Sequence, residues 1–96
     1  MLTTNQKDAF RISVAALDVD GEAERVEPWM LIDDVAETAE TVEDFRARWG
    51  APRQARSAGH TVFCWDNVQT RRGATRGDLR VVDFGDARAV HFSGEA

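Results

Sequence analysis

The sequence predicts an α+β fold: an N-terminal strand, two short helices and a three-stranded antiparallel β-meander, with the helices packed on one sheet face. Three observations predict it. Apolar residues alternate near the N-terminus, recur at helical spacing between residues 28 and 49, and form β-favouring runs separated by turns in the second half. A length of 96 residues suits a single domain over residues 1–96, in which we expect residues 1–8 and 94–96 to be frayed.

The first strand is predicted from the alternation of apolar with polar or small residues from Phe10 to Ala16. A helix over residues 6–17 is the alternative interpretation, but β-branched residues and serine at the centre of this segment are poor helix formers. Asp20-Gly21 then predicts a turn that folds residues 22–27 back as an edge strand.

Two short helices are predicted next. Pro28 suits the first position of a helix over residues 28–38, because its missing N–H would be unpaired there in any case. The stretch from Thr41 to Asp44 resembles a capping box that begins a second helix. Gly50 suits the C-terminal end of this helix.

Three strands are predicted in the second half, at residues 61–65, 79–84 and 87–92. Gly85-Asp86 is typical of a two-residue hairpin turn, and it sets a register that runs from Phe84 opposite Ala87 to Leu79 opposite Phe92. This register collects the apolar side chains of the hairpin on one face, namely Leu79, Val81, Val90 and Phe92. It also predicts an opposite-charge pair near the turn, between Asp83 and Arg88.

The net charge of −5 is unevenly distributed. Residues 1–50 carry twelve acids and five bases, whereas residues 51–96 carry five acids and seven bases. Overall acidity argues against general affinity for nucleic acids, because phosphates repel it. Eleven arginines against one lysine, with fourteen alanines, are typical of a GC-rich bacterial coding sequence. In length and type the chain is similar to small orphan proteins of mobile elements and gene cassettes.

A single cysteine, Cys64, excludes an internal disulfide and a zinc site with several thiolates, as expected for a cytoplasmic protein. The N-terminus lacks a signal-peptide pattern, and no apolar run is long enough to span a membrane. We therefore expect no membrane association.

The motifs that suggest catalysis or metal binding are incomplete. Asp83-Phe84-Gly85 matches the magnesium-binding triplet of protein kinases, but the glycine-rich loop, strand lysine and catalytic loop of those enzymes are missing. The acidic residues from 18 to 27 fit a calcium-binding EF-hand loop only in part, because Ala16 stands at its first ligand position. Cys64 lies in an apolar run that indicates burial rather than nucleophilic activation. We expect no catalytic residues, no metal and no cofactor.

The main functional hypothesis is a small non-enzymatic protein-interaction module. The predicted helices carry carboxylates on their outer faces, which would bind a basic partner protein in a salt-sensitive way. The residues assigned to this acidic face are Asp33, Asp34, Glu37, Glu40, Glu43 and Asp44.

The alternative hypothesis is a small-molecule site between helices and sheet, lined by Trp29, Trp49 and Trp65. A more remote one is weak contact with nucleic-acid phosphates through an exposed connection over residues 68–78. The arginines assigned to this anion contact are Arg71, Arg72, Arg76 and Arg80. An open edge of the meander would also suit a homodimer.

Overall fold

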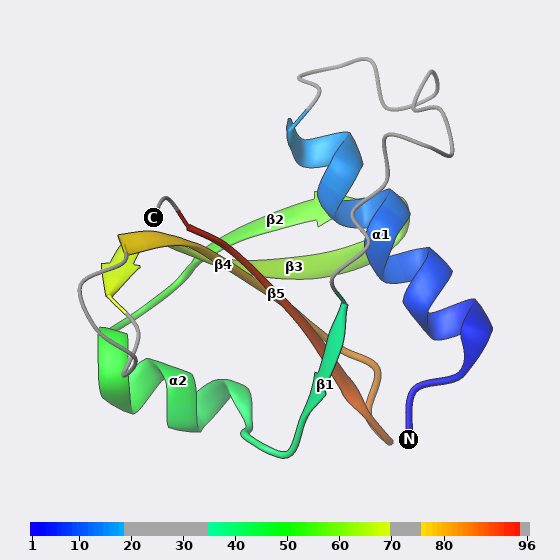
Figure 1. Cartoon of the computed structure of the whole chain (residues 1–96), viewed down its shortest axis with the longest axis horizontal. Helices are drawn as coiled ribbons and strands as arrows, with labels where there is room; N and C mark the ends of the chain where they lie inside the picture. The colour runs from blue at the N-terminus through cyan, green and yellow to red at the C-terminus, as the bar shows by residue number, and fades with distance from the viewer. Residues whose placement is uncertain (19–34, 70–75, 95–96) are drawn as a thin grey trace.

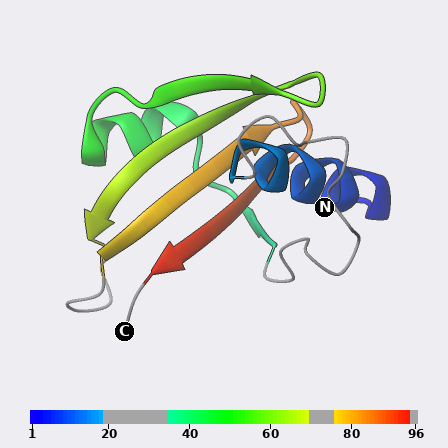
Figure 2. The same ribbon diagram turned by 90° about the horizontal axis from the view of Figure 1, so that it is seen from above.

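The computed structural model describes residues 1–18, 35–69 and 76–94. Its centre is a five-stranded antiparallel sheet in the order β1-β5-β4-β3-β2, with one described helix on each face (Figures 1 and 2). The expected α+β class is confirmed. The elements in chain order are α1 (Thr4–Asp18), β1 (Ala36–Thr38), α2 (Val42–Trp49), β2 (Arg53–Ser57), β3 (His60–Gln69), β4 (Arg76–Asp83) and β5 (Arg88–Gly94).

Helix α1 replaces the strand that we predicted near the N-terminus, and its first turns include residues that we expected to be frayed. A reciprocal pair of hydrogen bonds begins the helix: Thr3 N–H donates to Gln6 Oε1 at 2.9 Å, and Gln6 N–H donates to Thr3 Oγ1 at 3.1 Å. Phe10 and Val14 are buried on one side of the helix, whereas Ile12 is 43% exposed on another. The alternative interpretation, a helix over this segment, was therefore correct.

Strand β1 corrects the end of the helix predicted over residues 28–38. Residues 28–34, like the edge strand predicted at 22–27, lie outside the described residues. Ala36–Thr38 pair with β5 as a short antiparallel strand. The Arg88 side chain of β5 then holds the chain after β1 by donating to the carbonyl oxygens of Ala39 at 3.2 Å and Glu40 at 2.8 Å. For residues 36–38, pairing with the edge of β5 thus outweighs the helical spacing of the apolar residues in the sequence.

Helix α2 confirms the predicted second helix and its capping box. The Thr41 side chain accepts a hydrogen bond from Asp44 N–H at 3.2 Å, and an Asp44 carboxylate oxygen accepts one from Thr41 N–H at 2.7 Å. Gly50 follows the helix with φ of 82°, and its N–H donates to the carbonyl oxygen of Arg46. Glycine adopts this positive φ without the penalty that a side chain would bring.

Strands β4 and β5 form the predicted hairpin in the predicted register, with Val81 opposite Val90 and Leu79 opposite Phe92. Asp83 and Arg88 are also opposite each other. No ion pair joins them, because Asp83 accepts from Gly85 N–H at 2.7 Å and Arg88 contacts the carbonyls that follow β1. Of the connection predicted over residues 68–78, residues 68–69 and 76–78 are strand instead, and the remainder, residues 70–75, lies outside the described residues.

Strand β2 has no counterpart among the predicted strands. Its sequence, Arg-Gln-Ala-Arg-Ser, lacks the β-branched and aromatic residues that indicate strands. Ala58 and Gly59 connect it to β3 with φ of 50° and 82°. Two consecutive positive φ angles are the mark of the tight turn that matches the twist of a β-hairpin. The turn geometry therefore forms this strand in spite of its polar sequence.

The two described helices cover opposite faces of the sheet, which corrects the expectation that both pack on one face. Alternate residues of a strand point to opposite faces, so Val62 and Cys64 of β3 pack toward α1, whereas Phe63 and Trp65 pack toward α2. On the α1 face the buried core comprises Leu2, Phe10, Val14, Val62, Cys64, Val82, Ala87 and Ala89. On the α2 face it comprises Phe45, Trp65, Leu79 and Val81.

Candidate functional site

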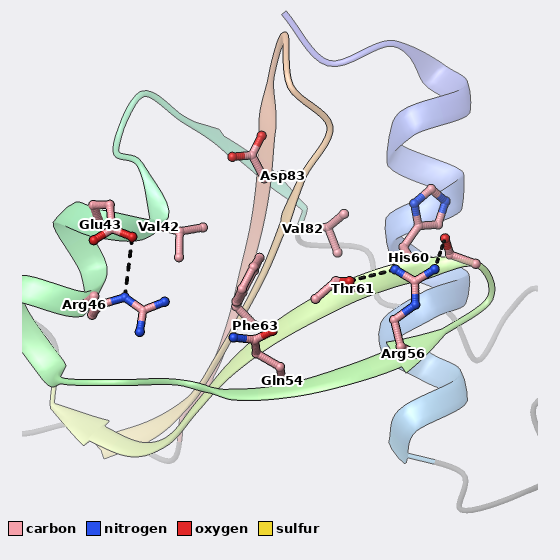
Figure 3. A pocket seen from close by; sticks show the side chains of 11 residues that line it. Val42, Glu43, Arg46, Gln54, Arg56, His60, Thr61, Phe63, Val82 and Asp83 are labelled. Atoms are coloured by element: carbon pink, nitrogen blue, oxygen red, sulfur yellow. Dashed lines mark hydrogen bonds and ion pairs between the residues drawn. The ribbon is translucent and has the colours of Figure 1, made fainter.

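The candidate site is an open groove on the α2 face of the sheet, with a volume of about 590 Å³ (Figure 3). It runs from the first turns of α2 to the β2–β3 turn, because α2 covers only part of the sheet. Phe63 of β3 and Val42 of α2 supply its apolar surface, and both are half-buried. The polar residues along it are Glu43, Arg46, Gln54, Arg56, His60, Thr61 and Asp83, of which His60 turns its ring toward Phe84.

Strand β2 borders this groove and is the last strand at its side of the sheet. Ser57 pairs with His60 across the two-residue turn. In a hairpin with such a turn, the two residues of this closing pair form backbone hydrogen bonds with each other. Hydrogen-bonded and non-hydrogen-bonded residue pairs alternate along an antiparallel ladder. The backbone groups of Ala55 and Arg53 therefore also form hydrogen bonds with β3. The backbone N–H and C=O groups of Gln54 and Arg56 therefore point outward, away from the sheet.

The side chains of Gln54 and Arg56 extend into the groove. In the register they stand opposite Phe63 and Thr61, which share the α2 face. Arg56 donates to Thr61 Oγ1 at 2.7 Å and to the Gly59 carbonyl oxygen at 3.2 Å (Figure 3). These bonds orient the guanidinium along the hairpin. The groove thus has exposed backbone groups and a positioned cation on the same border.

The other ionic groups of the groove have partners or lie farther from β2. Arg46 Nε lies 3.5 Å from Glu43 Oε1, in an ion pair within α2. Asp83 belongs to β4, which is separated from β2 by β3. Two strand spacings amount to about 10 Å, roughly one Debye length at physiological salt.

The predicted acidic face is only partly described, since Asp33 and Asp34 lie outside the described residues. The carboxylates that are described have local partners. Glu37 lies 3.1 Å from the N-terminal ammonium group, and Glu40 lies 3.0 Å from Arg48. Glu43 pairs with Arg46, as above, and hydrogen bonds from Thr41 lower the pKa of Asp44 below its ordinary value. This part of the surface therefore carries largely compensated charge.

The predicted tryptophan pocket is not where the groove lies. Trp29 is outside the described residues. Trp49 stacks on Phe45 with ring centroids 5.9 Å apart, and Trp65 meets the same Phe45 ring at 5.6 Å. The two described tryptophans thus come together around one phenylalanine, where they fill the core under α2.

Only two of the four arginines assigned to the predicted anion contact lie within the described residues. Arg71 and Arg72 lie outside the described residues. Arg76 donates to the side-chain and backbone oxygens of Asn67 at 3.1 and 2.8 Å. Arg80 is buried, with Asp66 at 3.0 Å and Asp78 at 3.8 Å from its guanidinium nitrogens. Arg80 therefore belongs to an ionic network within the sheet rather than to an exposed arginine loop.

This network lies on the α1 face, opposite the groove. The register puts Arg53, Cys64, Arg80 and His91 in one row across four strands. Arg53 donates to Asp66 at 3.2 Å, and this bond is the main reason why the pKa of Asp66 lies below its ordinary value. Cys64 is buried in the row. The ion pairs explain how the sheet can bury a guanidinium group.

Within residues 1–18, 35–69 and 76–94, histidine, cysteine and carboxylate side chains do not gather in groups of three or more that could hold a metal ion. No helix among these residues is both long and apolar enough to cross a membrane. Comparison of the chain with protein-family models, curated proteins and solved structures found no match. The groove and the edge of β2 are therefore the features that point to a function.

Sequence reasoning missed this site because its principal element, β2, has no strand-like pattern. The available signal was Ala58-Gly59, with glycine at the second position of a two-residue turn before the strongly β-favouring run that begins at Thr61. That signal would have predicted a hairpin, with β2 as its outer strand.

Proposed function

We propose that this protein is a non-enzymatic interaction module that binds an extended segment of a partner protein by adding it as a sixth strand beside β2. The observation that carries the proposal is the pair of outward backbone positions at Gln54 and Arg56, next to an open groove. Backbone hydrogen bonds would supply affinity, and side chains that enter the groove would supply specificity.

The edge of β2 is suited to this role. Arg53, Gln54 and Arg56 are exposed, and no hydrogen bond from another described residue reaches the outward backbone groups of Gln54 or Arg56. Edge strands with unpaired N–H and C=O groups are templates for strand addition. At the other border of the sheet β1 has only three residues, which makes it a shorter template.

The compensated carboxylates favour this edge over the predicted acidic face as the binding surface. Glu40, Glu43 and Asp44 would have to give up local partners before they could bind a basic protein. Among the described residues, no hydrogen-bond partner has to leave the outward groups of Gln54 and Arg56 before a strand binds. A bound strand therefore requires less rearrangement than a basic partner at the acidic face.

A small-molecule ligand is the second candidate, since 590 Å³ is within the range of roughly 300–1,000 Å³ typical of ligand pockets. Such pockets are mostly enclosed and apolar, whereas polar side chains supply most of the lining here. An extended peptide fits an open, polar groove better.

The test begins with selection of random peptides displayed on phage against the immobilised protein. The selected peptides are then titrated into the wild type and two variants, Gln54→Pro and Gln54→Ala. Proline removes the outward N–H of residue 54 without breaking a bond to β3, and is tolerated at such edge positions. Alanine keeps that N–H, so it serves as the matched control.

We expect Gln54→Pro to lose peptide binding and Gln54→Ala to keep it. Amide hydrogen exchange of the wild type provides a second measurement that does not depend on a folded variant: bound peptide should protect the amides of Gln54 and Arg56. Selection of no peptide, or protection confined to other residues, would contradict the proposal.

A further inference from the structure

Of the cations beside β2, Arg56 differs in its partners. Arg53 is bonded to Asp66, and Arg46 is paired with Glu43. For Arg56, by contrast, no carboxylate oxygen of a described residue lies within 4.0 Å, and its bonds go to a hydroxyl and a carbonyl oxygen. Arginine has five N–H donors in a fork that matches a carboxylate. Arg56 therefore has donors left for an anionic group that approaches along the edge.

The hydrogen-bonding pattern of an antiparallel pair of strands determines which residue of an added strand can carry this anionic group. An added antiparallel strand bonds to the outward groups of Gln54 and Arg56, so two of its residues stand directly opposite these positions. Directly opposite residues project to the same face of a sheet. Both of these partner side chains therefore project to the groove face, and they are two residues apart because successive side chains alternate.

The two positions have different surroundings. The partner residue opposite Arg56 meets a guanidinium group. The partner residue opposite Gln54 lies in line with Phe63, which is the cross-strand neighbour of Gln54 and is half-buried. An apolar side chain at this position would cover the exposed part of the Phe63 ring and gain the free energy of removing apolar surface from water.

We infer that the segment added beside β2 is acidic, with a carboxylate opposite Arg56 and an apolar residue two positions away, opposite Gln54. This inference rests on the proposed strand addition and specifies its partner. The net charge of −5 opposes an acidic segment at long range, but salt screens charges beyond about 8 Å. The preference of the β2 edge for an acidic segment therefore depends on the contacts at the edge itself.

A second copy of this chain fits the edge less well. Antiparallel pairing of two β2 strands centred on Ala55 would put Gln54 of each copy opposite Arg56 of the other. Four arginines, Arg53 and Arg56 of both copies, would then lie along a five-residue edge. Both Arg56 side chains would still lack a carboxylate. Charge thus favours an acidic partner over self-association.

The test uses two synthetic peptides, acetyl-Thr-Glu-Thr-Val-Thr-amide and the same peptide with lysine in place of glutamate, because an antiparallel strand whose glutamate is opposite Arg56 places the residue opposite Gln54 two positions toward its C-terminus. Both present an apolar and a charged residue two positions apart. Dissociation constants are measured by ¹⁵N-detected NMR titration to millimolar peptide with the wild type, Arg56→Glu, Gln54→Pro and Gln54→Ala. Size-exclusion chromatography of the free protein runs alongside.

For the wild type we expect the glutamate peptide to bind about tenfold more tightly than the lysine peptide, as for one charge-assisted hydrogen-bonded pair. Arg56→Glu should reverse the preference. Equal affinities, a preference that Arg56→Glu leaves unchanged, or no binding of either peptide would overturn the inference. A dimer whose Gln54 and Arg56 amides are protected would also overturn it, with a second copy as the occupant.

Failure of the inference and failure of strand addition give different results. If both peptides bind equally and both are lost on Gln54→Pro but not on Gln54→Ala, strand addition stands and the acidic preference is wrong. If Gln54→Pro leaves both affinities unchanged, strand addition itself is wrong, and the inference falls with it.

Discussion

Trp65 of β3 donates a hydrogen bond from its indole Nε1 to the carbonyl oxygen of Gly50 at 2.9 Å. Gly50 is the residue that ends α2, so this bond joins the helix terminus to the sheet. The Trp65 ring also packs against Phe45 on the inner side of the helix. One side chain thus contacts both the inner side and the C-terminal end of α2.

The first prediction concerns this bond. Trp65→Phe should lower the free energy of unfolding by about 2 kcal/mol, because it leaves a part-buried carbonyl without its donor and removes ring volume from the core. Urea unfolding followed by circular dichroism would measure this. Trp49→Phe is the matched control: its indole bond to the Gln69 carbonyl is longer, at 3.3 Å, and exposed, so its loss should be smaller. Equal losses for the two variants would contradict the prediction.

The second prediction tests the N-terminal helix. Phe10→Ala should destabilise the protein by about 3–5 kcal/mol, since Phe10 is fully buried. Ile12→Ala should change stability by less than about 0.5 kcal/mol, because Ile12 is 43% exposed. In a strand the two side chains would share one face and both substitutions would be costly. If Phe10→Ala does not fold, comparison of Val14→Ala with Ile12→Ala makes the same distinction by thermal unfolding.

The third prediction concerns the start of α2. Thr41→Ala should cost about 1 kcal/mol, because it removes the hydroxyl that accepts from Asp44 N–H. Thr41→Ser keeps this hydroxyl and should be close to the wild type. Chemical denaturation of the two variants side by side gives the difference. A serine variant as unstable as the alanine variant would mean that the capping box does not stabilise the helix.

The fourth prediction concerns acid stability. Hydrogen bonds from Thr41 lower the pKa of Asp44, and the hydrogen bond from Arg53 lowers that of Asp66, both below the ordinary value of 3.8. A folded-state pKa below the unfolded one stabilises the fold above the unfolded pKa. This contribution is lost as pH falls through the folded pKa. Stability should therefore decline as pH drops below about 4.

The control for the fourth prediction is Asp66→Asn, which removes the titrating carboxylate from the Arg53 and Arg80 pairs. Urea midpoints between pH 2 and 7 should show a shallower acid-side decline for this variant than for the wild type. Identical slopes for the two proteins would contradict a role for Asp66 in acid stability.

Where local chemistry was decisive, sequence analysis predicted the structure in detail. The Gly85-Asp86 turn and the apolar alternation on both sides of it agree with each other, and the register from Leu79 opposite Phe92 to Asp83 opposite Arg88 is confirmed. The capping box at Thr41 and the glycine at position 50 likewise predicted the two ends of α2. In both cases residues no more than 13 positions apart carry all the information.

Little of the candidate groove could be predicted in this way. Phe63 was recognised as part of a β-favouring run, but its half-exposed position depends on how far α2 extends over the sheet. Arg56 had no distinguishing feature among eleven arginines until the register put it opposite Thr61 at an unpaired edge. A site assembled from α2, β2 and β3 leaves no contiguous motif in the chain.

The sequence by itself determined the two ends of α2 and the β-hairpin of residues 79–92 with its Gly85-Asp86 turn, because these depend on short-range hydrogen bonds and on backbone angles that particular residues favour. Only the tertiary structure decided that residues 4–18 are a helix, that residues 36–38 join β5, and that the two described helices cover opposite faces. The physical reason is that the burial of apolar side chains stabilises whichever conformation of a segment covers the sheet. Phe10 and Val14 reach the α1 face of the sheet together from one side of a helix, and that long-range contact outweighs the weak local preference of Ile12 and Val14 for a strand.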